Sequence, residues 1–224
     1  MAKTSGLGAK FFYAGYDLSG DIGALSRIGG GPALLPVTGI DKSAYERIGG
    51  LRDGGMEFQS WFNPATGQQH ERFSALPTAD QIVTYAHGTT RGNPAACLVA
   101  KQLNYVPTRN ADGSLTVAIS TQANAYGLEW GTQLTDGLKN LTGVSAIPSV
   151  DFTTASSFGL QAYLHVTTFT GTSATITLQE SSDDGGADIF AAITGGAFTA
   201  SAIGAQRLAT SGSLAVERYM RASV

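Results

Sequence analysis

Few residues of this sequence are of a type that carries out chemistry, and their spacing matches no catalytic or metal-binding motif. The histidines are His70, His87 and His165, and no two of them are four residues apart, the spacing at which a helix presents paired metal ligands. The single cysteine, Cys97, lies in an apolar stretch, where a small buried side chain is the usual role. We therefore expect no zinc site, no disulfide and no cofactor.

Two short segments have the composition of ligand-binding loops. Asp183, Asp184 and Asp188 could together offer oxygen ligands to calcium, but they lack the alternating spacing of a calcium loop, and a solvated turn explains them as well. The glycine run 29–31 has neither the preceding strand nor the following helix that a phosphate-binding loop requires. The sequence therefore predicts no catalytic, cofactor-binding or metal-binding residues, and a protein that is not an enzyme.

Aromatic side chains offer a different chemistry, the stacking of sugars or bases. Trp61, Trp130 and Tyr163 could belong to such a surface, which keeps a glycan-binding module open as an alternative function. Tyr219 and Arg221 share one face of an expected strand near the end of the sequence, and strand packing accounts for them.

The charge of the chain argues against nucleic acid and membranes as partners. Charged residues make up 14% of the sequence, against about 25% in typical soluble domains. Residues 1–112 hold 10 basic and 9 acidic side chains and residues 113–224 hold 4 and 8, so neither half has the basic stripe that grips phosphates. No apolar run is long enough to span a bilayer, and the first residues lack the apolar core of a signal peptide, which predicts synthesis in a cytoplasm. A surface this poor in charge is suited to burial against other subunits.

The first part of the sequence combines flexible and apolar residues. Residues 1–40 hold nine glycines together with more than ten large apolar side chains, so we expect an extended arm that lies across its own core or across another subunit. We predict that residues 4–36 contact another subunit. Asp41 can cap a helix and Gly49 can end it, which predicts one short helix over 41–50.

Strands dominate the remainder. Alternation of apolar and polar residues predicts strands at 56–62, 81–87 and 127–134, one helical turn within 71–80, and a hairpin of 95–105 with 114–124 around Gly113. After a linker at 136–149, strands are expected at 158–168, 172–180, 189–193, 197–202 and 214–222. Leu160, Leu164, Ile176, Leu178 and Val216 are predicted to form one core, and the last strand, which ends at Val224, is predicted to be an edge that a partner could complete.

Several segments resemble virion proteins of actinobacterial siphophages. The resembling stretches are 44–63, 75–85, 99–105 and 127–135 in the first part, and 175–184 and 217–221 in the second. Residues 40–135 are similar to tail-tube proteins, and residues 150–222 are similar to the β-sandwich often appended to virion proteins. The resemblance implies a virion protein made in the cytoplasm of the bacterial host, a self-assembling ring or lattice of identical copies, and contacts with other virion proteins. It implies no functional residue.

The predicted fold class is mainly β: a tail-tube-like β-barrel or sandwich with one short helix, followed by a jelly-roll-like β-sandwich. The predicted domains are an N-terminal arm at 1–40, a tail-tube-like β domain at 41–138 and an accessory sandwich at 146–224. The expected function is that of a major tail protein that assembles into stacked rings. A capsid decoration protein and a glycan-binding surface module are the alternatives.

Overall fold

The computed structural model describes residues 3–224, and these are mainly β, with 49% of residues in strands and 2% in a helix. The strands form antiparallel sheets, and within the described residues no sheet closes into a barrel. The predicted mainly-β fold class with one short helix is therefore confirmed, in the form of β-sandwich-like open sheets.

The chain divides into two compact units, each made from segments that are distant in the sequence. The first, here called the sandwich unit, comprises the chain up to Asp17, Thr84–Ala95 and Trp130–Val224. The second, here called the arm unit, comprises Leu18–Val83 and Ala96–Glu129. The three domains proposed from the sequence stay a prediction about which parts fold independently.

The arm unit is built on four neighbouring strands in the order β6-β8-β4-β3, with β7 also paired to β8. The bounds of its elements are β3 (Ile22–Pro36), β4 (Arg47–Trp61), α1 (Gln69–Phe73), β7 (Val106–Arg109) and β8 (Leu115–Ala123). The strands β5 (Gln81–Ala86) and β6 (Pro94–Gln102) are each divided between the two units, at Val83 and at Ala96. Its core contains Phe58 and Phe73, whose ring centroids lie 5.4 Å apart, together with the buried Met56, Leu98 and Ile119. The alternation along β4 places Met56 and Phe58 on one face, as the sequence predicts, and Ile119 of β8 lies opposite Phe58 on that face.

The prediction of a helix over 41–50 is wrong, because these residues do not form one. Residues 37–46 instead connect β3 to β4, with the Val37 N–H bonded to the Glu46 carbonyl at 3.0 Å, and β4 begins at Arg47. The two strands pair along their whole length, from Ile22 opposite Ser60 to Pro36 opposite Arg47. A helix cap contributes about 1 kcal/mol, which cannot compete with a ladder of this length.

Two other local predictions in the arm unit hold with small changes. The helical turn expected within 71–80 is present as α1, slightly earlier, at Gln69–Phe73. The expected hairpin is present with a break: β7 and β8 pair around the turn at Gly113, which has a φ of +90°, and β6 pairs with the far part of β8 from Ala100 to Gln102.

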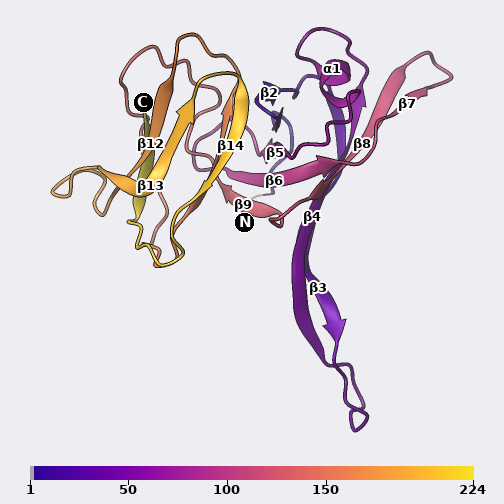
Figure 1. The fold of residues 1–224 in the computed structure, drawn as a ribbon, viewed down its shortest axis with the longest axis horizontal. Helices are drawn as coiled ribbons and strands as arrows, with labels where there is room; N and C mark the ends of the chain where they lie inside the picture. Colours follow the sequence, from indigo (N-terminus) through magenta and orange to yellow (C-terminus); the bar gives the residue numbers. More distant parts are fainter. Residues whose placement is uncertain (1–2) are drawn as a thin grey trace. The chain divides into compact units, whose positions relative to one another are not determined.

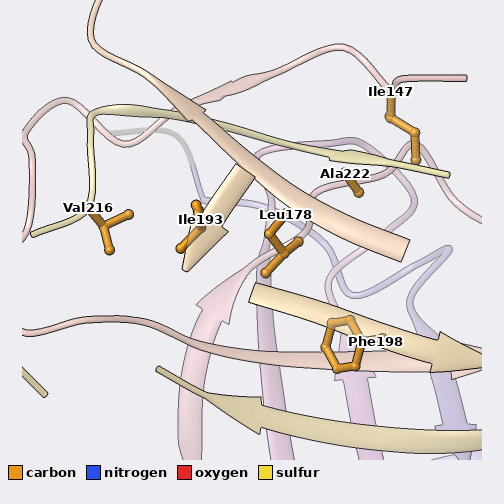
Figure 2. Close-up of a cluster of buried hydrophobic side chains, with 6 residues drawn as sticks. All are labelled: Ile147, Leu178, Ile193, Phe198, Val216 and Ala222. Atoms are coloured by element: carbon orange, nitrogen blue, oxygen red, sulfur yellow. The ribbon is translucent and has the colours of Figure 1, made fainter. Parts of the chain in front are cut away.

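The sandwich unit contains a four-stranded sheet in the order β10-β15-β12-β13 and a two-stranded sheet of β11 and β14. Their bounds are β10 (Val150–Asp151), β11 (Gln161–Val166), β12 (Ala174–Ser181), β13 (Ala191–Ala200), β14 (Gly204–Ala209) and β15 (Tyr219–Ser223). Figure 2 shows their shared core of Ile147, Leu178, Ile193, Phe198, Val216 and Ala222. Leu160, Leu164 and Ile176 pack against it, so the core predicted from the sequence is confirmed.

Residues 10–17 belong to the folded structure. Lys10–Tyr13 (β1) and Tyr16–Asp17 (β2) form a small hairpin in the sandwich unit, and Phe11 and Tyr13 are each only 2% exposed. The chain between Glu129 and Thr132 forms a short strand, β9. A contact of residues 4–36 with another subunit stays a prediction.

The end of the chain is paired within the chain, contrary to the edge expected at Val224. β15 lies between β10 and β12, and both the N–H and the carbonyl of Val224 bond to Ser145, at 2.9 and 3.0 Å. The segment before β10 therefore fills the position that was expected to await a partner strand.

Candidate assembly surface

The three histidines each have a structural partner in a different place. His70 Nδ1 lies 2.7 Å from the Tyr105 hydroxyl, and His87 Nε2 lies 3.2 Å from the Thr4 hydroxyl. His165 Nδ1 accepts a hydrogen bond from the Gly15 N–H at 3.2 Å. Across residues 3–224, His, Cys, Asp and Glu side chains do not gather in any group of three that could hold a metal ion.

No helix within residues 3–224 is long and apolar enough to cross a membrane.

The acidic loop after β12 uses its carboxylates on its own backbone. The Asp183 carboxylate accepts hydrogen bonds from the N–H groups of Gly186, Ala187 and Asp188 at 2.6–3.3 Å. These bonds, the one from Ala187 above all, hold the pKa of Asp183 below its usual value. The Asp183 carboxylate therefore stabilises the turn through hydrogen bonds to its own backbone.

Cys97 is buried, as the sequence predicts.

The aromatic residues considered for glycan binding have varied surroundings. Trp61 and Trp130 are 51% and 59% exposed. Tyr163 is engaged within its own sheet, because its hydroxyl accepts a hydrogen bond from Arg207 Nε at 3.0 Å. A small hollow of about 250 Å³ lies beside exposed Phe158, and its lining offers only one hydroxyl, that of Thr210, and no titratable side chain. A glycan-binding role stays a prediction.

The most unusual feature of the described chain is a projecting hairpin in the arm unit. β8 pairs with β4 only from Gly55 to Trp61, whereas β3 continues to pair with β4 as far as Arg47. Residues 31–53, here called the arm, are therefore a ribbon of two strands that extends well beyond the third strand, as Figure 1 shows. An isolated two-stranded ribbon is only marginally stable in water, so an arm of this length gains from a partner surface.

The arm carries large apolar side chains in contact with solvent. Leu51 is 88% exposed and Tyr45 is 75% exposed, and the others are Leu34, Leu35, Val37, Ile40 and Ile48, each 45% exposed or more. Scattered apolar residues are normal on a protein surface, but a contiguous set of this size is typical of a surface that binds another protein.

These side chains occupy both faces of the ribbon. Leu35 is directly opposite Ile48, and residues paired in this way share one face. Leu34 is opposite Gly49 on the other face, where a Cβ at Gly49 would lie 3.5 Å from Pro32. An arm that is apolar on one face could lie on a flat surface, whereas an arm that is apolar on both faces is suited to insertion between two surfaces.

The polar groups of the arm balance one another. Asp41, Glu46 and Asp53 oppose Lys42, Arg47 and Arg52, so the formal charge of residues 31–53 is zero. Lys42 Nζ lies 3.7 Å from both Asp41 and Glu46, and the Arg47 guanidinium lies 4.9 Å from the Tyr45 ring centroid. Exposed pairs of this kind contribute little, which leaves apolar burial as the main contribution that the arm can make to binding.

The sequence indicated part of this surface and missed its form. The glycines, prolines and large apolar residues of 1–40 predict an extended arm, and residues 4–36 are predicted to contact another subunit. The return strand was missed because residues 41–50 also satisfy the rules for a capped helix. The signal for a hairpin lies in the apolar residues of 33–37 and in Ile48 and Leu51, with glycines at 29–31, 39, 49 and 50.

No protein-family model and no curated protein matches the sequence. Among solved structures, the chain is similar to one in the virion of a native gene transfer agent particle, with 13% identity and a TM-score of 0.42, over 58% of this chain and 99% of that one. It is also similar to the Dit protein of phage SPP1, described as a hub of the adsorption apparatus in phages that infect Gram-positive bacteria, with 10% identity and a TM-score of 0.33, over 96% and 94% of the two chains. Likenesses this distant carry no functional argument, which leaves the exposed surface of the arm as the feature that indicates a role.

Proposed function

We propose that this protein is a structural virion subunit that assembles with copies of itself through the arm, and that its assembly is the stacked ring of a phage tail tube. The observation that carries the proposal is the two-stranded ribbon 31–53, with apolar side chains exposed on both faces. The resemblance of the sequence to siphophage virion proteins is the reason for proposing a phage tail as the particle.

The size of the arm fits a specific protein interface. Stable interfaces use about 20–30 residues on each side, and the arm offers about 23. Its large apolar residues lie close together, and burying one such side chain contributes roughly 1.5–3 kcal/mol of transfer free energy. Enclosing Leu51 and Tyr45 alone would contribute roughly 3–6 kcal/mol, against an association cost of about 4–15 kcal/mol, so a stable contact must bury most of the exposed apolar residues of the arm.

A ring follows from a head-to-tail contact. If the arm of one copy enters a different surface on the next, the contact is heterologous, and repetition of it closes into a ring or continues as a filament. Both apolar faces are buried if the arm lies between two neighbouring copies. A tube of stacked rings offers such a position, because each subunit there has neighbours within its ring and in the adjoining ring.

The test is assembly of an arm variant. Leu51→Asp places a charge on a β4 side chain of the ribbon that is 88% exposed, where it cannot disturb a packed core, and should leave a folded protein that no longer assembles. Ile189→Asp is the matched control, since Ile189 is 75% exposed but lies outside the arm. Negative-stain microscopy and sedimentation should show rings or tubes for the unmodified protein and the control, and monomers for Leu51→Asp.

The same images separate the alternatives. Small closed oligomers without stacking would indicate capsid decoration and refute the tail tube. Assembly of Leu51→Asp at the concentration that suffices for the unmodified protein would refute the role of the arm.

A further inference from the structure

A patch of glycines lies where the arm leaves the sheet. Gly29 is opposite Gly55 and Gly30 is opposite Gly54, so two successive cross-strand pairs have no side chains. The ladder between β4 and β8 also ends at Gly55, opposite Gln122. At this position the ribbon loses both its side-chain pairs and its third strand, which are the features that stiffen a sheet.

Leu128 fills the surface that these glycines leave open. A Cβ on Gly54 would lie 2.6 Å from the Leu128 backbone N and 2.7 Å from its Cβ, and a Cβ on Gly30 would lie 2.8 Å from the Leu128 Cβ. Leu128 is only 8% exposed. The backbone of the segment that follows β8 can therefore pass close to the backbone of Gly30 and Gly54 only because neither residue has a side chain.

A side-chain hydrogen bond also connects the base of the arm to β8. The Asp53 carboxylate accepts a hydrogen bond from the Gln122 side-chain amide at 2.7 Å and another from the Gly54 N–H at 2.7 Å. This tie is exposed to water and therefore weak, whereas the Leu128 contact is buried.

We propose that the glycine pair Gly30–Gly54 is a hinge for the arm and that Leu128 is the positioning residue that locks it in the direction needed for assembly. The consequence for assembly rests on the proposed function of the arm, whereas the lock itself is a property of the isolated subunit. Packing of Leu128 restricts bending of the ribbon at a point where neither side-chain pairs nor a third strand oppose it.

The lock can be measured without assembly. Nitroxide labels at Ala44→Cys, near the tip of the arm, and Thr108→Cys, on β7, report the direction of the arm in a Leu51→Asp background that stays monomeric. Cys97 is buried and stays unlabelled. Leu128→Ala should broaden the distance distribution between the labels and speed amide exchange over 47–54 by roughly 5- to 30-fold.

Leu103→Ala is the matched control, because Leu103 belongs to the same unit and is 59% exposed. Leu128→Met, which conserves volume, should restore the narrow distribution. If Leu128→Ala does not fold, Leu128→Val should broaden the distribution less but in the same direction.

The results separate the lock from the function of the arm. An unchanged distribution in a folded Leu128→Ala or Leu128→Val protein refutes the lock. With Leu51 restored, Leu128→Ala should also raise the concentration needed for assembly about ten-fold or more, and a broadened distribution with unchanged assembly refutes its control of assembly. Assembly by Leu51→Asp itself would instead refute the proposed function and leave the lock intact.

Discussion

His165 should make the stability of the sandwich unit depend on pH. Its Nδ1 accepts a hydrogen bond from the backbone N–H of Gly15, and its Nε2 lies 2.9 Å from the Thr84 hydroxyl. Since a backbone N–H can only donate, Nδ1 must be unprotonated, and the proton is on Nε2, which donates to Thr84. Phe12 covers the ring, with centroids 5.5 Å apart. The imidazole is therefore held in its neutral form.

The groups around the ring offer no compensation for a positive charge. β1 presents Phe12, the β1–β2 turn presents the Gly15 N–H, β5 presents the neutral Thr84, and β14 places Ala205 opposite His165. Tyr13, also on β1, is a buried phenol whose pKa is raised by burial, so it stays neutral. Burial lowers the pKa of His165 from 6.5 to about 4.

The sign and size of the effect come from linkage between proton binding and folding. Between pH 6.5 and about 4 the unfolded chain binds a proton at this position and the folded chain does not. Stability from His165 is therefore complete above pH 6.5 and is lost as the pH falls toward 4. A difference of about 2.5 pH units, at 1.36 kcal/mol for each, corresponds to a loss of about 3 kcal/mol.

The measurement is the free energy of unfolding in urea at intervals from pH 7 to pH 4. His165→Asn is the comparison, because its side-chain oxygen can accept the Gly15 N–H but does not titrate. The variant should be less stable at pH 7, having lost the ring contact with Phe12, and its stability should fall less steeply with acid. Parallel pH profiles for the two proteins would refute the reasoning.

Three further outcomes are expected. Gly15→Ala should lower the unfolding free energy by about 2 kcal/mol or more, because φ is +92° and a Cβ would lie 2.5 Å from the Gly204 backbone N; Gly20→Ala, where a Cβ meets nothing within 4 Å, should change it little, and equal effects would contradict the account. Leu178→Ala should cost about 2–5 kcal/mol in chemical unfolding, against a small change for Val144→Ala, which removes a 96% exposed side chain. Because the arm has no net charge and its proposed contact is mainly apolar, assembly should survive a rise from 50 to about 500 mM salt, as followed by sedimentation, and dissociation over that range would indicate charged contacts instead.

Local patterns in the sequence predicted many of the strands and core residues of the sandwich unit. The alternation of Ile176 and Leu178 with threonine and glutamine predicts β12 within two residues of its bounds, because one face of a strand is buried and the other is not. The core residues came from the same pattern. The scarcity of charged residues in the sequence favours a surface that is buried against other subunits.

Long-range pairing decided the rest. Asp41 and Gly49 satisfy the local rules for a helix, but the ladder between β3 and β4 overrides them, because its many paired residues outweigh one cap. The bond from Gly15 to His165 spans 150 positions, and the Leu128 contact joins positions almost 100 apart. No local pattern predicts such contacts, since they depend on which strands become neighbours and in which register. The partner of the last residue is likewise distant in sequence: Ser145 and Val224 exchange two backbone hydrogen bonds beside the paired strands β10 and β15.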